Sequence, residues 1–411
     1  MSDWQNLSDQ LRKMGVKFGF QEDISKRNKS WPIQSVLKCE ETSTALGSIL
    51  SVKKRYKLDY TQGNYNLHPA AKFLRLLQLA DIPGNVSISL NNFIFLDAET
   101  TGLSGGSGTM IFLLGLSKYD DGDLILEQFF LRNPSEEEAF LHVISQFCKD
   151  MKVVITFNGK AFDIPILNTR HILQRVPSPF MDVYHIDLLT ISRQLWKLRL
   201  EQCRLSNIEQ HILQFHRDGA EVPGYLAPEF YKDYLRTGDA RPLKGVFYHN
   251  QEDVVSLAAL FSHIANILEN PLDDKLPFSH DSYSLGRVFE RLNKTDIAHQ
   301  LYQQSHVHQD DFNLRTRFLL QQASLFKRQN MYQNALSLWE EAASLQSITA
   351  MEELAKYHEH KSKHLQIALQ LTNRALEQLK DEKEMNLKVY TRFENRRTRL
   401  INKIKKTEFK G

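Results

Sequence analysis

The sequence predicts an α/β domain, in which a mixed sheet is flanked by helices, followed by an all-helical domain. Between residues 93 and 186, short apolar runs typical of strands alternate with segments of helical periodicity. After residue 275 the pattern stays helical to the end. We expect three parts: an N-terminal extension (1–90), partly flexible and with a basic cluster; the α/β domain (91–270); and the helical domain (275–411) with a basic C-terminal tail.

Composition narrows the class of protein. A length of 411 residues suggests two or three domains, and 42% hydrophobic and 25% charged residues are ordinary for a soluble globular protein. The net charge of +3 does not by itself indicate a nucleic-acid-binding protein. The three cysteines are far apart and form neither a metal-binding spacing nor a disulfide framework. No signal pattern opens the chain, and no apolar run approaches the roughly 20 residues of a membrane span, so we expect a cytoplasmic protein without a membrane partner.

The N-terminal extension offers few local signals. Leu7, Leu11 and Met14 indicate one short amphipathic helix. The run 53–57 (KKRYK) is a basic cluster that could grip phosphates, although a solvated strand or loop face is the favoured interpretation. Residues 70–79 are predicted to be helical.

Periodicity and turn residues predict the elements of the α/β domain in order. Three apolar runs (93–96, 111–116 and 124–130) predict strands, with a hairpin turn at 120–123 between the last two. Ser135 begins a helix with acidic residues in its first turn. The remaining predicted elements are a buried strand (153–157), a helix (163–173), a strand (183–186), and helices at 188–200, 205–215, 228–235 and 246–268.

The helical domain contains two similar blocks. Residues 332–336 with Ala342 match residues 365–369 with Ala375 at an offset of 33 residues. This period and its small alanines resemble tetratricopeptide repeats, in which paired helices pack closely. The domain could pack on the α/β domain or bind a protein partner, and both interpretations stay open. The tail carries basic residues that could contact nucleic acid or form a solvated end: Arg396, Arg397, Arg399, Lys403, Lys405, Lys406 and Lys410.

Candidate chemistry begins in the stretch 94–102 (IFLDAETTG). Asp97 and Glu99 are two residues apart, so on a strand both carboxylates project to the same side. Paired carboxylates at a strand end form an oxygen-rich site of the kind that Mg²⁺ or Mn²⁺ prefers. The small, turn-prone residues 100–102 would let a ligand approach closely. Alone, such a pair is more often a solvated strand end, so a site needs support from elsewhere.

Two further segments supply acids at helix starts. The predicted strand 153–157 breaks at residues 158–159 and delivers Asp163 to the first turn of a helix. His249 and Asp253 are four apart at the start of a long helix and share one face. Four carboxylates gathered together would repel one another unless cations neutralised them. Two divalent metal ions about 3.5–4 Å apart could be held in this way, with a histidine accepting the proton of the attacking water.

In their order, the blocks 95–102, 158–163 and 249–253 resemble the DnaQ-like (DEDD) 3′–5′ exonucleases of the ribonuclease H-like fold. The resemblance covers about residues 90–270, and with the helical repeats behind it the chain is similar to the bacterial YprB-like exonuclease group. The resemblance implies that Asp97, Glu99 and Asp253 bind one metal ion. It further implies that Asp97 reaches a second ion, which Asp163 holds partly through water.

The resemblance also implies substrate contacts and a general base. Thr100, Thr101, Gly102 and Leu103 would face the terminal nucleotide, and Asn158 the substrate backbone. The histidine branch of the family places its base five residues before the last aspartate, and the tyrosine branch four. Here Tyr248 is five and His249 four residues before Asp253, a departure from both patterns. Because residues four apart align on a helix, His249 is favoured as the general base, with Tyr248 packing or stacking on a base.

Other polar residues are weaker candidates. Asp187 ends a predicted strand, where a buried strand-end acid is favoured over a supporting role. Arg236 and Arg241 lie in a predicted loop and could reach substrate phosphates or simply be exposed. The glycine-rich run 103–108 lacks the Gly-Lys-Ser/Thr ending of a phosphate-binding loop, so it is interpreted as a flexible turn beside the site.

Taken with the resemblance, these features predict a metal-dependent 3′–5′ exonuclease that releases nucleoside 5′-monophosphates. The likeness to repair and proofreading exonucleases favours DNA over RNA and a role in DNA repair, with a helicase as a candidate partner of the helical repeats. Three alternatives stay open: an RNA-processing 3′–5′ exonuclease, a structure-specific endonuclease on the same fold, and a protein-binding scaffold whose nuclease domain is incidental.

Overall fold

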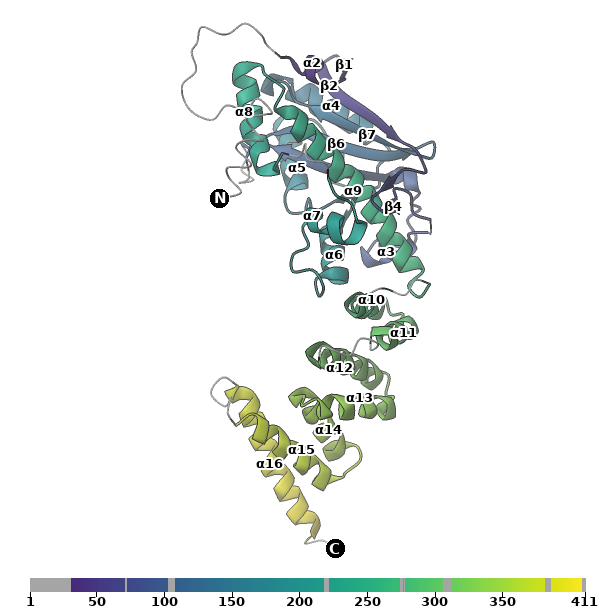
Figure 1. Cartoon of the computed structure of the whole chain (residues 1–411), viewed down its shortest axis with the longest axis vertical. Coiled ribbons are helices and arrows are strands. Elements are labelled where there is room, and N and C mark those ends of the chain that lie inside the picture. Colours follow the sequence, from purple (N-terminus) through teal and green to yellow (C-terminus); the bar gives the residue numbers. More distant parts are fainter. Residues whose placement is uncertain are drawn as a thin grey trace. The chain divides into compact units, whose positions relative to one another are not determined.

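The computed structural model describes residues 31–70, 72–102, 108–217, 222–273, 276, 278–305, 312–380 and 386–408. The chain forms two compact units, Met1–Pro271 and Leu272–Gly411 (Figure 1). The helix predicted around Leu7, Leu11 and Met14 lies outside the described residues, and so do Leu103 and Lys410.

The first unit is built on a mixed sheet of seven described strands. In spatial order they are β1 (Glu40–Thr44), β2 (Gly47–Tyr56), β7 (Asp123–Phe130), β6 (Ile111–Asp120), β5 (Phe93–Thr100), β8 (Val153–Thr156) and β9 (Tyr184–Asp187). Neighbours from β1 to β5 run antiparallel, whereas β5, β8 and β9 run parallel. The predicted α/β class with a mixed sheet is confirmed.

Helices surround this sheet. Before residue 180 they are α2 (Ile33–Val36), α3 (Leu74–Leu79), α4 (Glu137–Phe147) and α5 (Asp163–Leu173). Later ones are α6 (Leu188–Trp196), α7 (Leu205–Ile208) with the π-helical turn η4 (Glu209–Leu213), α8 (Ala227–Thr237) and α9 (Leu243–Glu269). Short elements complete the described part: the 3-10 turns η2 (Leu90–Asn92), η3 (Pro134–Glu136) and η5 (Gly224–Leu226), and the paired strands β3 (Thr61–Gln62) and β4 (Tyr65–Asn66).

Helices α4 and α9 lie on opposite faces of the sheet (Figure 1). Gln128 and Phe129 are neighbours on β7, so their side chains point to opposite faces. The Gln128 amide donates a hydrogen bond to the main-chain oxygen of Phe247 in α9. The Phe129 ring packs edge-on against Phe147 of α4. The sheet is therefore covered on both faces, which accounts for its continuous apolar runs.

Strand β5 lies at the centre of the sheet and ends in the candidate acids. It pairs with β6 on one side and with β8 on the other, and Phe93, Ile94, Phe95 and Leu96 are fully buried. The pairing of β5 with β6 shifts register between Glu99 and Thr100. Such an irregularity bends a strand and re-aims its side chains, here next to the two carboxylates.

Residues 40–56, which the sequence placed in an N-terminal extension, form β1 and β2 of the sheet. β1 (EETST) has no apolar residue and lies at the sheet edge, so its sequence carries no strand pattern. The basic cluster 53–57 lies at the exposed end of β2, where Arg55 and Lys57 contact Asp123 at 2.8 and 2.9 Å. This placement fits the favoured interpretation of a solvated strand face.

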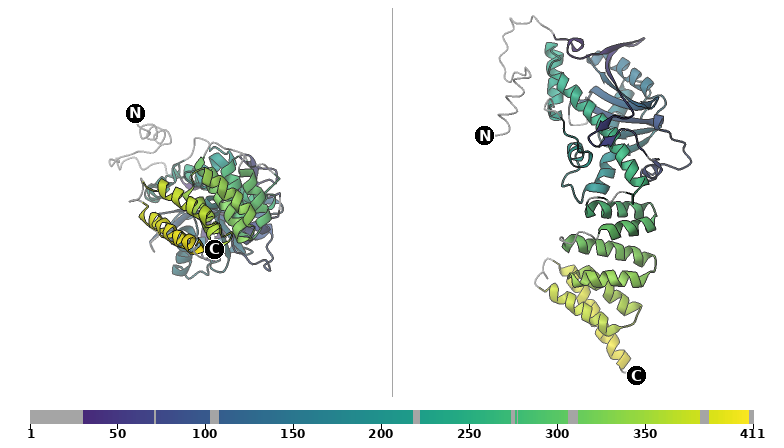
Figure 2. Two further views of the ribbon diagram at one scale, coloured as in Figure 1. Left: turned by 90° about the horizontal axis from the view of Figure 1, so that it is seen from below. Right: turned by 45° about the vertical axis from the view of Figure 1, so that its right-hand side comes forward.

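The second unit is a run of described helices: α10 (Ser279–Arg291), α11 (Thr295–Ser305), α12 (Phe312–Arg328), α13 (Tyr332–Ser344), α14 (Ile348–His360), α15 (Leu365–Gln378) and α16 (Leu387–Glu408). Consecutive helices contact one another, and Figure 2 shows them following one after another. Ala335, Ala342, Ala368 and Ala375 are fully buried between helices. The predicted helical run is confirmed, whereas its assignment to tetratricopeptide repeats stays a prediction.

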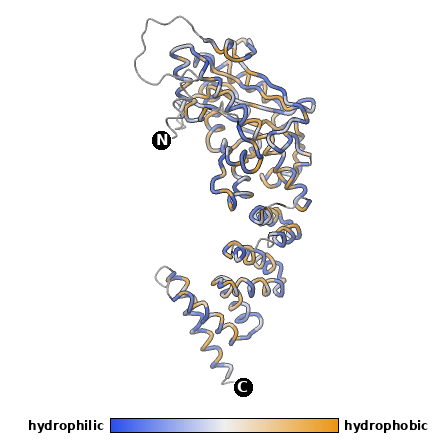
Figure 3. The backbone as a smooth tube through the Cα atoms, in the orientation of Figure 1, coloured by the Kyte–Doolittle hydropathy of each residue, from blue (hydrophilic) through white to orange (hydrophobic). Residues whose placement is uncertain are grey.

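Hydropathy along the chain fits these two architectures. In Figure 3, hydrophobic and hydrophilic residues alternate along the helices of the second unit, as expected for helices that bury one face. None of the helices that the structure describes has the length and apolar character needed to cross a bilayer.

The basic tail is largely paired with acids of its own unit. Arg396, Arg399 and Lys403 of α16 contact the Glu359 carboxylate of α14 at 3.1, 2.7 and 2.8 Å. The Glu359 side chain is fully buried, and Arg392 binds the Glu352 carboxylate in the same way at 2.7 Å. These contacts attach α16 to α14, which is a structural role for much of the tail.

Candidate active site

Asp97 near the end of β5 is held by the side chain of Asn250 on α9. The Asn250 amide on α9 donates to the main-chain oxygen and to Oδ2 of Asp97, at 3.0 and 2.9 Å. Gln128 of β7 donates in turn to Oδ1 of Asn250 at 2.9 Å. These hydrogen bonds link Gln128, Asn250 and Asp97 in one network. The network fixes the position of α9 against the end of β5 and the orientation of the Asp97 carboxylate.

Gly115 of β6 makes this contact between helix and sheet possible. A Cβ atom at this position would lie 2.4 Å from Oδ1 of Asn250 and 2.8 Å from Cγ2 of Val254. Both distances are too short for a real contact, so only glycine lets α9 approach the sheet here.

A tight turn after β8 places Asp163 at the start of α5. Asn158 has a φ of +69°, and Asp163 is the first residue of the helix. A Cβ atom on Gly159 would lie 2.7 Å from Oδ2 of Asp163 and 2.6 Å from Cβ of Thr156. The Asn-Gly break thus folds the chain directly under the carboxylate.

Asp187 supports this turn from β9. Its carboxylate accepts main-chain hydrogen bonds from Asn158 at 2.9 Å, Lys160 at 3.3 Å and Leu189 at 3.0 Å. The bond to Leu189 caps α6, and the other two fix the turn that carries Asp163. Asp187 is therefore a strand-end acid with a structural task beside the site.

The four carboxylates of Asp97, Glu99, Asp163 and Asp253 influence one another's ionisation. Burial raises the pKa of Asp97 well above its ordinary value, and the other three carboxylates raise it further. Burial raises the pKa of Glu99 to about 8; His249 opposes this rise, whereas Asp253 and Asp163 add to it. Burial likewise raises the pKa of Asp163 to about 7, with contributions from Asp187 and Asp253. Acids from β5, α5 and α9 therefore lie near enough to disfavour one another's ionisation.

His249 and Asp253 share one face of α9, as their spacing predicts. Nε2 of His249 lies 3.5 Å from Oδ2 of Asp253. The backbone of Gly224 closes over the ring, since a Cβ atom there would lie 3.2 Å from Nε2. Tyr248, the residue before His249, is half-buried.

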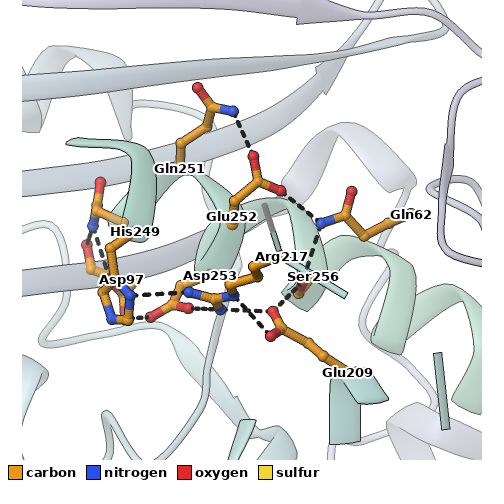
Figure 4. Close-up of polar contacts among 10 residues, drawn as sticks. Gln62, Asp97, Glu209, Arg217, His249, Gln251, Glu252, Asp253 and Ser256 are labelled. Atoms are coloured by element: carbon orange, nitrogen blue, oxygen red, sulfur yellow. Dashed lines mark hydrogen bonds and ion pairs between the residues drawn. The ribbon is translucent and has the colours of Figure 1, made fainter. Parts of the chain in front are cut away.

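Arg217 is a site residue that the sequence did not reveal. Its guanidinium binds both carboxylate oxygens of Glu209, with Nε to Oε2 at 2.8 Å and Nη2 to Oε1 at 2.7 Å (Figure 4). Nη2 also donates to Oδ1 of Asp253, and Nη1 lies 3.0 Å from Nδ1 of His249. Burial opposes the charge of Arg217, but Asp253 and Glu209 more than offset it and raise its pKa.

The role of Arg217 could not be predicted from the sequence because the preceding helix ends irregularly. Residues 205–215 have helical periodicity, but the structure has one α-helical turn followed by the π-helical turn η4. Gln214 then takes a φ of +55° and reverses the chain. This reversal cannot be predicted from hydrophobic periodicity, and it brings Arg217 into contact with Glu209.

A buried polar network continues from Glu209 away from the carboxylates (Figure 4). Ser256 of α9 donates to Oε1 of Glu209 at 2.6 Å, and Gln62 of β3 donates to Ser256 at 3.3 Å and to Glu252 at 2.9 Å. Gln251 donates to the other oxygen of Glu252 at 2.8 Å and accepts from Lys54 of β2. The polar side chains in the interior of α9 are thus satisfied by partners from β2, β3 and η4, which fix the helix that carries His249 and Asp253.

The predicted substrate-contact residues lie at the open end of β5. The Thr100 hydroxyl donates to the main-chain oxygen of Gly102 at 2.9 Å, and the Thr101 hydroxyl accepts from the main-chain nitrogen of Met110 at 3.1 Å. Among the described residues, no atom lies within 4 Å of where a Cβ of Gly102 would be, so none of them fills the space there. Asn158 lies in the turn below Asp163, and Leu103 is outside the described residues.

The arginines named as loop candidates are occupied by their neighbours. Arg236 pairs with Asp233 at 3.0 Å, and Arg241 pairs with Asp239 at 2.5 Å. The Arg241 guanidinium also lies 5.1 Å from the ring centre of Trp31. These contacts are local and solvent-exposed, which favours the interpretation of an exposed loop.

The donor chemistry fits a hard divalent cation, but the side chains are not assembled around one. Carboxylate oxygens short of positive charge are the ligands that Mg²⁺ and Mn²⁺ prefer. In the part of the chain that the structure describes, no group of three or more His, Cys, Asp or Glu residues has the arrangement of a metal site. One oxygen of Asp253 is taken by Arg217 instead.

Comparisons with known proteins agree with this fold. Residues 94–265, which contain all four carboxylates and His249, match the RNase H superfamily. The uncharacterised protein YprB of Bacillus subtilis (strain 168) is 33% identical over 331 residues, covering 78% of this chain and 78% of that protein. Among solved structures, the chain is similar to the family B DNA polymerase of the hyperthermophilic archaeon Pyrobaculum calidifontis, with 14% identity and a TM-score of 0.32. That likeness covers 49% of this chain and only 29% of the polymerase chain.

Proposed function

The chain belongs to the family of the Bacillus subtilis protein YprB, and we propose that it is a metal-dependent 3′–5′ exonuclease that hydrolyses phosphodiester bonds of DNA. The observation that carries the proposal is that the carboxylates of Asp253, Glu99 and Asp163 all raise the pKa of buried Asp97 within the RNase H superfamily region. The superfamily supports a nuclease. The direction of degradation and the preference for DNA are drawn from the resemblance to DEDD exonucleases.

Four carboxylates are assigned to the metal ions. Asp97, Glu99, Asp163 and Asp253 would hold two divalent cations, Mg²⁺ or Mn²⁺, which supply Lewis acidity at the scissile phosphate when bound. The polypeptide prepares this site through Asn250, which orients Asp97 by hydrogen bonds of 3.0 and 2.9 Å. The turn fixed by Asp187 does the same for Asp163.

His249 is the proposed general base. An imidazole titrates near neutral pH and can accept the proton of an attacking water, which a carboxylate engaged with a cation cannot do as well. Its position on the same helix face as Asp253, with Nε2 at 3.5 Å from that carboxylate, places it beside the acids. Tyr248 would pack beside this histidine or stack on a base of the substrate.

The open end of β5 is proposed to receive the 3′-terminal nucleotide. Thr100, Thr101, Gly102 and Leu103 would face that nucleotide, and Asn158 would face the substrate backbone. The open space around Gly102 supports this assignment, because a ribose or base needs room next to the carboxylates. A role in DNA repair, with a helicase bound by the helical unit, completes the proposal.

The test is degradation of end-labelled nucleic acid by the full chain. Single- and double-stranded DNA and RNA of one sequence are incubated with Mg²⁺, Mn²⁺ or a chelator. Shortening of DNA from the 3′ end, with release of 5′-monophosphates only when metal is present, supports the proposal, and D97N is the inactive control. Faster degradation of RNA would instead favour an RNA-processing enzyme, and cleavage of circular DNA would favour an endonuclease. If wild-type protein and D97N behave alike on every substrate, the nuclease proposal is wrong.

A further inference from the structure

Arg217 connects the two functional residues of α9 to an anchor outside the carboxylate cluster. One guanidinium contacts Glu209, Asp253 and His249 at once (Figure 4). No other part of the proposed mechanism uses Arg217 or Glu209. The question is what a permanent positive charge does at an acid that is expected to bind a metal ion.

The anchor on Glu209 does not depend on Asp253. Two parallel hydrogen bonds of 2.8 and 2.7 Å join Arg217 to Glu209, the bidentate geometry that matches a guanidinium to a carboxylate. The exposed fractions of the two side chains are 7% and 2%. Ser256 holds Glu209 further, at 2.6 Å. Arg217 would therefore stay in place if Asp253 were taken away from it.

At Asp253 the guanidinium occupies an oxygen that a cation would need. Nη2 of Arg217 donates to Oδ1, while Oδ2 lies 3.5 Å from Nε2 of His249. A divalent ion binds through the lone pairs of such oxygens and is repelled by a guanidinium at contact distance. Both cations cannot use the same side of Asp253 together.

At His249 the same guanidinium decides which ring nitrogen carries the proton. Arginine has only donors, so Nδ1 of His249 at 3.0 Å must offer its lone pair to Arg217. In the neutral ring the proton then lies on Nε2. While this contact persists, neither nitrogen is available to accept a proton from water.

We propose that Arg217 is a resident counter-cation of the active site, which holds Asp253 and His249 in the metal-free protein and competes directly with the divalent cation for Asp253. This inference rests on the proposed function. Binding of a metal ion at Asp253 would break only the contact of Arg217 with that carboxylate, while the two hydrogen bonds to Glu209 hold the guanidinium in the site.

The test is direct titration of Mn²⁺ into the full chain by calorimetry, without nucleic acid. The decisive variant is the double substitution E209Q/R217Q, which removes one positive and one negative charge together. It leaves the net charge unchanged and removes Glu209 together with its partner, so that Asp253 is the carboxylate that loses its cation. We expect it to bind Mn²⁺ about tenfold more tightly than wild type, the scale of one charge-assisted hydrogen bond lost by the competitor. A merely structural role for Arg217 would weaken Mn²⁺ binding instead.

The matched control is E137Q/R170Q, which removes another buried bidentate pair of the same unit. Arg170 lies in the last turn of α5, at the opposite end from Asp163, and binds both oxygens of Glu137 on α4. We expect Mn²⁺ affinity to be unchanged in this control. A second variant, R217Q, removes the competing charge and leaves Glu209 with its hydrogen bond from Ser256, so it should also bind Mn²⁺ more tightly, and it decides the question if E209Q/R217Q does not fold.

Two results would overturn the inference. Equal or weaker Mn²⁺ binding by the folded Arg217 variants, or an equal gain in the E137Q/R170Q control, would exclude direct competition while leaving the proposed nuclease intact. Absence of Mn²⁺ binding in wild type and all variants would instead overturn the metal-dependent function, and the inference with it.

Discussion

Two acidic centres of this molecule, one in each unit, carry opposite charge balances. In the helical unit, burial disfavours ionised Glu359, yet hydrogen bonds from Arg399 and Lys403 more than offset it and lower its pKa to about 2. In the sheet unit, burial and neighbouring acids raise the pKa of Asp97 and Glu99. Glu359 has several cations in contact with its carboxylate, whereas in the second group Arg217 binds one member, Asp253. Burial alone therefore does not mark a functional acid; a shortage of counter-charge does.

The largest expected effect is at Asp97. D97N removes one of the charges that repel one another, while Asn can still accept the hydrogen bond from Asn250. We expect nuclease activity to fall about 10³-fold, on the scale of losing charge stabilisation at a reacting phosphate, while the metal-free protein melts at an equal or higher temperature. Initial rates and thermal melts of the same preparation check both halves. If D97N instead clearly lowered the melting temperature, Asp97 would stabilise the fold as Glu359 does, and the proposed difference between the two acids would be wrong.

The corresponding substitution in the helical unit is E359Q, which removes a carboxylate that is paired with cations. It leaves Arg396, which is almost fully buried, without its carboxylate partner, so we expect the helical unit to lose about 3 kcal/mol of unfolding free energy. Urea unfolding of the full chain measures this loss of stability, and nuclease activity is measured separately on the same protein. The control R399Q removes a partner that is 47% exposed and should cost much less. An E359Q protein as stable as wild type would show that its cations serve another purpose.

Next comes the pair of adjacent residues on α9. H249A should lower the turnover rate about 100-fold at neutral pH, the range of a lost general base, whereas Y248F should leave it nearly unchanged. Single-turnover rates measured across pH provide the comparison. The assignment of the base to His249 fails if H249A retains the wild-type rate, or if Y248F alone carries the loss.

The smallest expected effect is on the pH dependence of stability. Glu99 and Asp163 have folded-state pKa values of about 8 and 7, above their unfolded values. The folded protein therefore binds more protons than the unfolded chain between about pH 4.5 and 8, and its stability falls as pH rises through that window. Glu359, whose pKa is lowered, contributes a stability that is constant there and is lost only as pH falls toward 2.

Thermal melts of metal-free protein at pH 5, 6.5 and 8 test this slope, with Mn²⁺ added in a parallel series. The added ion should reduce the slope because it supplies the missing counter-charge. A slope that survives in E99Q combined with D163N would trace it to other groups.

Much of the sheet could be predicted because its signals are local. The apolar runs of β5, β6, β7 and β8, and the Asp163 start of α5, appear in the sequence where the structure has them. β1 could not be predicted, since a polar edge strand is defined by its pairing with β2 and not by its own residues. The candidate acids could be predicted from their spacing in the sequence, but their hydrogen-bond partners could not. Asn250 and Arg217 reach Asp97 and Asp253 through long-range packing and through the irregular turn η4, neither of which has a period.

The missing side chain at Gly115 has a consequence for genetics. A methyl group there would collide with Oδ1 of Asn250, the side chain that orients Asp97, and with Cγ2 of Val254. Because it would push α9 away from the sheet, alleles at this codon would lower both the abundance of the protein and the activity of each folded molecule. A screen that measures activity per folded molecule would therefore place β6 among the catalytic elements, although residue 115 itself has no functional role.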